Sequence, residues 1–183
     1  MKNEIDLEKL KFPIGHFDSH MEISNKDLTD WKETIATLPH KLQKMVHELS
    51  SEELNWKYRP NGWTIKQVVH HLADSHLNSF IRFKLTLTED TPTIRPYDEA
   101  KWAETVDGLS EDLTPSLQIL EGVHQRWSLL LDDLTEADWN RMYFHPEHQH
   151  LVAIKTALGT YNWHCQHHLA HIEQALYHRG EFN

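Results

Sequence analysis

The sequence predicts an all-α protein with the architecture of a four-helix bundle. Four long segments repeat apolar residues at helical spacing, and the chain contains only six glycines and seven prolines. No two segments alternate apolar and polar residues strongly enough to predict a paired sheet. Four amphipathic helices without strands are typical of a bundle that buries one apolar core.

The length of the chain predicts a single domain. A chain of 183 residues with 39% hydrophobic residues can bury one full core. We therefore expect one domain over residues 1–183, in which residues 1–23 form an irregular N-terminal segment that packs on the bundle. Phe12-Pro13-Ile14-Gly15 is expected to be a loop within that segment.

The first long helix is expected to begin after Ser24 and to run to about Leu49. Ser24 and Asp27 have the spacing of a helix N-cap and its partner. Pro39 falls inside this helix and should kink or split it, because proline lacks a backbone donor. A short helical turn is expected over residues 50–54.

The second long helix is expected over residues 64–88. Thr64 and Gln67 form a capping box at its start, and Pro92 follows its end. Residues 89–113 form a connection too long for a simple bundle turn. With a short helix near residues 98–104, it is either a crossover or a functional loop.

The third and fourth long helices are expected over residues 114–131 and 154–179. Thr114 is the expected N-cap of the third, with Pro115 in its first turn, and Gly180 ends the fourth. A short turn is expected at residues 135–139. Residues 140–153 are expected to form a small hairpin or a loop.

The fourth helix carries four histidines within eight residues. On a helix, residues four apart lie one above the other, so His164 pairs with His168, and His167 pairs with His171. Two imidazoles one turn apart can chelate a divalent transition metal. The chain has 16 histidines, so such pairs could also arise from composition alone.

A third ligand is expected from the second helix. His71 lies on a polar face of that helix, and if this face approaches the fourth helix, three imidazoles meet in a cleft with positions open to water or substrate. Spacing alone does not decide whether His71 or its neighbour His70 is the ligand on the second helix. It also does not decide between the pair 164/168 and the pair 167/171 on the fourth. The other residues of the face are Asp74, Ser75, Asn78 and Arg82.

Charge and composition narrow the class of partner. The formal net charge of −10 offers no basic patch for nucleic acid. No apolar run is long enough to cross a membrane, and the N-terminus lacks the apolar segment of a signal peptide. We therefore expect a cytoplasmic protein without a nucleic-acid or membrane partner. Its single cysteine, Cys165, lies on the apolar stripe of the fourth helix and is expected to be a residue packed in the core.

Several segments together resemble the DinB-like superfamily, and most closely its YfiT branch of metal-dependent hydrolases, which includes bacillithiol S-transferases. The resemblance covers nearly the whole chain. It implies a four-helix bundle of the DinB/YfiT type and a homodimer. It rests on Phe12–Gly15, Gly62–His76, Asn78–Lys84, Ile94–Tyr97, Tyr143–Pro146, Ala157–His164 and His167–Ile172.

The resemblance also implies a set of ligands. In the family, the second histidine of the helix-two pair and a His-x-x-x-His on the last helix bind one divalent metal. On this sequence these residues are His71, His167 and His171. Zinc or nickel is the expected metal, although imidazole ligands alone do not separate the first-row metals.

Two enzymatic activities and one binding function follow from such a site. In a hydrolase, the metal activates a water molecule against a small-molecule substrate. In a thiol S-transferase, it binds a thiol such as bacillithiol, as co-substrate, in the thiolate form. A non-catalytic metal-binding stress protein is the third alternative.

Supporting roles are assigned to a few further side chains. Asp74 could orient a ligand or act as a base, and Asn78 and Arg82 could bind an anionic group of the substrate. His76 is expected to be a core histidine with its hydrogen bonds satisfied. A second metal site at His145, His148 and His150 is less favoured than a simple loop.

Overall fold

The computed structural model describes residues 6–183, and none of the helices in this range is long and apolar enough to cross a membrane. Residues 1–5 of the expected N-terminal segment lie outside the described residues. The elements are α1 (Leu7–Lys11), α2 (Asn25–Val46), α3 (Ser51–Leu54), α4 (Ile65–Thr88), α5 (Glu99–Trp102), α6 (Thr114–Asp132), α7 (Glu136–Trp139), β1 (Met142–His145), β2 (His150–Ala153) and α8 (Ile154–His178).

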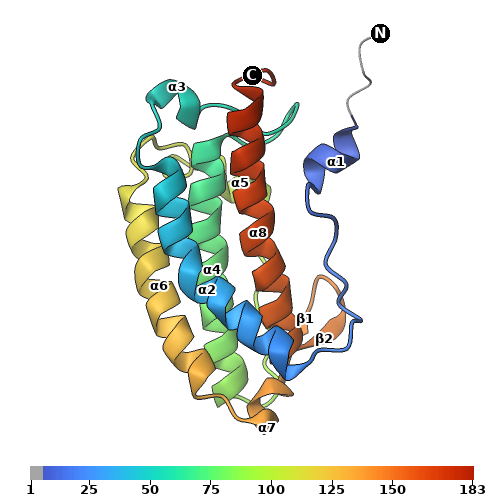
Figure 1. The fold of residues 1–183 in the computed structure, drawn as a ribbon. Coiled ribbons are helices and arrows are strands. Elements are labelled where there is room, and N and C mark those ends of the chain that lie inside the picture. Colours follow the sequence, from blue (N-terminus) through green and yellow to red (C-terminus); the bar gives the residue numbers. More distant parts are fainter. Residues whose placement is uncertain (1–5) are drawn as a thin grey trace.

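The predicted four-helix bundle is confirmed, and α2, α4, α6 and α8 form it (Figure 1). Helix α2 packs against α6 and α8, and α4 packs against the same two helices. Helices α4 and α8 are therefore neighbours, which brings the histidines of the two helices to the same interface. Helix α2 continues through Pro39 without a break.

The helix starts follow the capping chemistry of the sequence. In the capping box of α2, Ser24 Oγ accepts from the Asp27 amide at 3.2 Å, and Asp27 Oδ2 accepts from the Ser24 amide at 2.8 Å. Thr64 and Gln67 form the same box at α4. The prediction for α6 was wrong by one residue. Thr114 is its first residue, and Leu113 is an N-cap without a side-chain bond.

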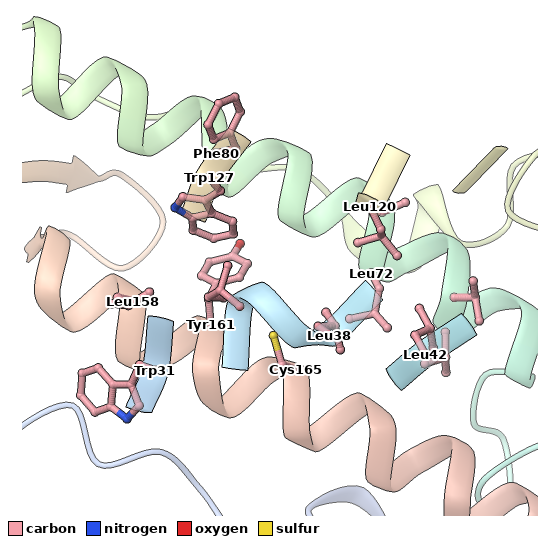
Figure 2. Packing of buried hydrophobic residues seen from close by; sticks show 14 of the residues in the cluster. Trp31, Leu38, Leu42, Leu72, Phe80, Leu120, Trp127, Leu158, Tyr161 and Cys165 are labelled. Atoms are coloured by element: carbon pink, nitrogen blue, oxygen red, sulfur yellow. The ribbon is translucent and has the colours of Figure 1, made fainter. Parts of the chain in front are cut away.

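The apolar core is built by side chains from all four long helices (Figure 2). Leu38 of α2, Leu72 of α4, Trp127 of α6 and Leu158 of α8 are each at most 1% exposed. Cys165 is fully buried among them, and burial raises the pKa of its thiol. A buried thiol with a raised pKa stays protonated and is a packing residue rather than a nucleophile, in agreement with the prediction.

Residues 142–153 form the hairpin that the sequence left as one of two alternatives. Strands β1 and β2 are antiparallel, with Tyr143 opposite Val152. The hairpin also holds the connection after α4, because the Phe144 amide donates to the Pro92 carbonyl at 2.9 Å and the Ile94 amide donates to the Phe144 carbonyl at 3.1 Å. The long connection is thereby fixed beside the bundle.

The N-terminal segment lies along α8 (Figure 1). It contains the short helix α1, capped by Asp6, where the sequence predicted only irregular structure. Two side chains of α8 donate to its carbonyls: Trp163 Nε1 to Gly15 at 2.9 Å and Gln174 Nε2 to Leu10 at 3.0 Å. Part of the polar face of α8 is therefore covered by the segment and not by solvent.

Gly159 of α8 lies directly against two aromatic rings, Trp31 of α2 and Phe17 of the N-terminal segment. A Cβ at this position would lie 2.7 Å from the rings of both Phe17 and Trp31. We expect Gly159→Ala to lower the free energy of unfolding by about 1–3 kcal/mol, because two rings would have to move in a packed core. Urea denaturation monitored by circular dichroism measures this change.

Gly122 of α6 provides the matched control, because a Cβ there would meet no atom within 4 Å. Gly122→Ala should raise the free energy of unfolding by about 0.5–1 kcal/mol through helix propensity. Equal effects of the two substitutions would contradict the close packing at Gly159.

Candidate metal centre

The ligand candidate on α4 is His71, and its neighbour His70 serves a structural role. His70 uses both ring nitrogens inside the protein: Nδ1 bonds the Ser116 hydroxyl at 2.8 Å and Nε2 bonds the Ser110 carbonyl at 2.9 Å. Because Nε2 must donate to the carbonyl, the lone pair of His70 is on Nδ1, where it accepts from the Ser116 hydroxyl and is not offered to α8. His71 is buried, with 4% exposure, and its Nε2 faces α8. The structure thus separates two histidines that spacing could not.

His164 and His168 of α8 face His71. One nitrogen from each of the three rings lies within 4.8 Å of the others, and His71 Nε2 lies 3.1 Å from His164 Nε2. Two nitrogens that share a tetrahedral zinc at 2.0–2.1 Å are separated by about 3.3 Å. The observed separation therefore matches that of two ligands of one metal.

The orientation of the three rings also suits a shared metal. The ring planes of His71 and His164 are inclined by 54°, those of His71 and His168 by 64°, and those of His164 and His168 by 75°. An imidazole lone pair lies in the plane of its ring, so mutually inclined rings can direct their lone pairs to one point. We call His71, His164 and His168 the histidine triad.

His167 and His171, which the resemblance assigned as ligands, lie in a second group with His168. His171 Nε2 bonds the Lys11 carbonyl at 3.0 Å and its Nδ1 contacts His168 Nδ1 at 3.4 Å, so both nitrogens are held by groups other than His71. His167 stacks on Trp163 with ring centroids 4.3 Å apart, and its Nδ1 is buried without a partner. The structure does not gather His71, His167 and His171 around one point.

The triad imidazoles are held in the neutral form that binds metals. Burial first, and then the charge of His167, lowers the pKa of His71 to about 4. Burial also lowers the pKa of His164 and of His168 well below the usual range, and the neighbouring histidines lower both further. Neutral rings need not release a proton to expose a lone pair.

The triad lies in the wall of a cavity of about 410 Å³. This volume is in the range of small-molecule sites. Aromatic side chains line much of it, and Trp63 packs on the His71 ring at 4.7 Å. The charged lining residues among those described are Lys11, Arg59 and Glu99. The remaining lining residues are Phe12, Tyr58, Trp163, His167 and His171.

Glu99 is a cavity residue that the sequence did not single out. It begins the short helix α5 in the connection after α4. Surrounding protein raises the pKa of its carboxyl, and the Arg82 guanidinium partly offsets this. The prediction that this connection is a functional loop was the only available signal, because nothing marked Glu99 among the 28 acidic residues.

The three supporting residues predicted on α4 do not line this cavity. Asp74 is half-buried, and burial followed by the charge of Asp107 raises the pKa of its carboxyl. Asn78 Nδ2 donates to the backbone carbonyl of Asp74 at 2.8 Å. Arg82 acts on Glu99 by its charge and does not itself line the wall.

The hairpin histidines form a third group, in which His145, Glu147 and His148 come close together. The rings of His145 and His148 are stacked at 4.3 Å with only 26° between their planes. Stacked rings direct their lone pairs side by side, so they cannot converge on one ion. The positive charge of Arg82 also acts on His145 and opposes a bound cation. The triad is the better metal site.

The fold and the triad together define a helical-bundle protein with a three-histidine centre. The model of the DinB superfamily matches residues 34–172, and the chain belongs to this superfamily. The chain is 44% identical over 165 residues to "Putative metal-dependent hydrolase YfiT" of Bacillus subtilis, covering 90% of this chain and 93% of that protein. A protein of Oceanobacillus iheyensis with the same functional description is 46% identical over 162 residues, covering 88% and 93% of the two chains.

A solved structure agrees with the sequence comparisons. The structure of YfiT from Bacillus subtilis superposes with a TM-score of 0.90 at 43% identity, covering 94% of this chain and 98% of that chain. It is described as a probable metal-dependent hydrolase with an unusual four-helix bundle topology. The resemblance inferred from the motifs is thus confirmed.

Proposed function

We propose that this protein is a divalent-metal-dependent hydrolase whose metal is bound by His71, His164 and His168. The observation that carries the proposal is the convergence of three neutral imidazoles from two helices on the wall of a small-molecule cavity. Three protein ligands leave at least one position for water or substrate, which is typical of catalytic sites. The names of the relatives support the same activity.

The residues present fit such a metal. A divalent ion on three imidazoles acts as a Lewis acid and lowers the pKa of a coordinated water to about 7. Zinc and nickel both suit imidazole ligands, and we propose one of them. The indole of Trp63 packs beside His71 and excludes water from that side of the ligand.

The cavity wall also provides groups for the substrate. Glu99 is the only carboxylate that lines the cavity among the described residues, and it is placed to accept a proton during hydrolysis. Lys11 and Arg59 carry positive charge at the same wall and would attract an anionic group. The site therefore favours a small, anionic, hydrolysable molecule.

A second candidate is transfer of a thiol. The two cations in the cavity wall equally suit an anionic thiol such as bacillithiol, and a metal that binds a thiol deprotonates it. The difference from hydrolysis lies in which molecule occupies the open position.

The cytoplasmic location and the homodimer stay predictions from the sequence.

A metal-dependent activity screen tests the proposal. We expect tag-free protein to hydrolyse members of an ester and amide panel, to lose this activity after chelation, and to regain it with one equivalent of zinc or nickel. Glu99→Gln should lower kcat by about 100-fold at unchanged metal content, as expected for loss of a proton acceptor. Glu33→Gln is the matched control, because Glu33 is exposed on α2 and lies outside the cavity.

The same screen includes thiols with a haloalkyl electrophile. Turnover in this arm alone would replace the hydrolase proposal with the transferase, and turnover in neither arm would favour the non-catalytic metal-binding protein. The tag is removed because a histidine tag purified on nickel can introduce that metal.

A further inference from the structure

The two triad ligands on α8 are each bonded, through the nitrogen that faces away from the triad, to another histidine. His164 Nδ1 lies 3.1 Å from His76 Nε2, and His168 Nδ1 lies 3.4 Å from His171 Nδ1. A neutral imidazole carries one donor and one acceptor, so the bond at one nitrogen determines the state of the other. Each ligand is therefore coupled to the proton positions of its neighbours.

The first chain of bonds ends at the backbone carbonyl of Ile35. His124 Nδ1 lies 2.5 Å from this oxygen, which can only accept, so His124 donates from Nδ1 and accepts at Nε2. His76 Nδ1 lies 2.8 Å from His124 Nε2 and must donate to it. His76 Nε2 then accepts from His164 Nδ1, and His164 Nε2 keeps its lone pair. We call His124 and His76 the Ile35 relay.

The second chain ends at the backbone carbonyl of Lys11. His171 Nε2 lies 3.0 Å from this oxygen and donates to it, so His171 Nδ1 is an acceptor. His168 Nδ1 donates to His171 Nδ1, and His168 Nε2 keeps its lone pair. We call His171 the Lys11 relay. His164 and His168 therefore both carry the proton on Nδ1 and the lone pair on Nε2. The two carbonyls that determine this lie on different elements, Ile35 on α2 and Lys11 on α1.

Burial keeps the rings of both chains neutral, so that each ring has one donor nitrogen and one acceptor nitrogen. His76 and His124 are at most 1% exposed, and His171 is 2% exposed. No carboxylate within residues 6–183 hydrogen-bonds any ring of the two chains, so no counter-charge supports a protonated ring. Burial lowers the pKa of His124, at the far end of the first chain, to about 4.

We propose that the Ile35 relay and the Lys11 relay set the tautomers of His164 and His168, so that both present an unprotonated Nε2 to the metal before it arrives. His76, His124 and His171 are then positioning residues, which act through the ligands and do not touch the metal. This inference rests on the proposed metal site. It gives a role to buried histidines outside the triad.

The relays make a specific statement about His71. His71 Nε2 lies 3.1 Å from His164 Nε2, which has no proton, so His71 donates this hydrogen bond in the metal-free protein. To bind a metal through Nε2, His71 would have to carry its single proton on Nδ1 instead of Nε2, whereas His164 and His168 already have a free lone pair on Nε2. One ligand changes tautomer and two do not.

Long-range ¹H–¹⁵N NMR of histidine-labelled protein reads these states directly. In the metal-free protein we expect the Nδ1–H tautomer at His76, His124, His164 and His168, and the Nε2–H tautomer at His71 and His171. Saturation with zinc should change the tautomer of His71 alone. An Nε2–H tautomer at His164 or His168 in the metal-free protein would overturn the proposal.

Zinc affinity of paired variants tests the relays by a second measurement. His76→Gln can place Oε1 where Nε2 accepts from His164, whereas His76→Phe removes the acceptor. We expect His76→Phe to weaken zinc binding by about 10–100-fold and His76→Gln to stay within about threefold of the wild type. His171→Leu and His171→Asn form the equivalent pair for the Lys11 relay, since Asn Oδ1 can occupy the Nδ1 position.

His70→Phe is the matched control, because it removes a buried histidine with two hydrogen bonds from the same helix but outside both relays. Equal zinc affinities of the Phe and Gln variants at position 76, together with equal affinities of the Leu and Asn variants at 171, would overturn the proposal. If a variant of either relay fails to fold, the tautomers that NMR measures in the metal-free wild type still test the proposal. A wild-type protein that binds no zinc would refute the proposed function, while the metal-free NMR would still test the relays.

Discussion

Replacing His164 or His168 with alanine is expected to lower zinc affinity by more than about 100-fold, because each substitution removes one of three ligands and the loss should exceed that of an outer-shell partner. His71→Ala should have the same effect. The proposed hydrolysis should disappear with the metal. Metal analysis after dialysis against a defined zinc buffer, with calorimetry for the affinity, measures the change.

His167→Ala is the matched control for this experiment. His167 lies on the same helix and lines the same cavity, but it groups with His168 and His171 rather than with His71. We expect this variant to keep its full metal content. Loss of metal from His167→Ala with retention in His164→Ala would instead favour the ligand set that the family resemblance implied.

The metal-free protein is expected to unfold cooperatively in mild acid, with a midpoint near pH 5. His71 and His124 are buried, and burial lowers the pKa of each from 6.5 to about 4. His76 and His168 are also buried, and burial lowers the pKa of each of them as well. Below pH 6.5 the unfolded chain therefore binds protons that the folded chain does not. The resulting stability is complete above pH 6.5 and is lost as the pH falls toward about 4.

The size of the effect follows from the number of rings. Each histidine that is neutral in the folded protein and protonated in the unfolded chain lowers the free energy of unfolding by about 1.4 kcal/mol for each pH unit that the pH falls. The four rings together lower the free energy of unfolding by about 5.5 kcal/mol per pH unit, against a usual total of about 5–15 kcal/mol. Acid should therefore remove most of the stability within about two pH units.

Urea denaturation at several pH values between 7 and 5 measures this slope. His124→Gln removes one of the four rings and should reduce the slope by about 1.4 kcal/mol per pH unit, whatever its effect at neutral pH. A free energy of unfolding that stays constant from pH 6.5 to 5 would show that the buried histidines are protonated in the folded protein.

Much of the fold could be predicted from local chemistry. The capping boxes at Ser24 and Thr64 and the stop at Gly180 are short-range signals, and they place the helix ends within a few residues. Helix α1 was missed because five residues with no buried side chain show no apolar periodicity. The hairpin stayed ambiguous because its strands have only four residues each.

The prediction for α8 shows where periodicity is insufficient. It pairs His167 with His171 and does not report what covers them, and the structure buries both, at 7% and 2% exposure. The covering group is the N-terminal segment, whose Lys11 carbonyl bonds His171. A segment far away in the chain can bury a polar face, and no pattern within the helix reports its presence.

The sequence by itself determined the four helices, the histidine pairs on α8 and the presence of a histidine pair on α4. Only the tertiary structure decided which of these rings meet. The pairs 164/168 and 167/171 are offset by three residues, which turns them by about 60° around the helix axis. The rotation of α8 against α4 is set by packing across the whole bundle. That packing turns His164 and His168 toward His71, and it brings His171 to the Lys11 carbonyl.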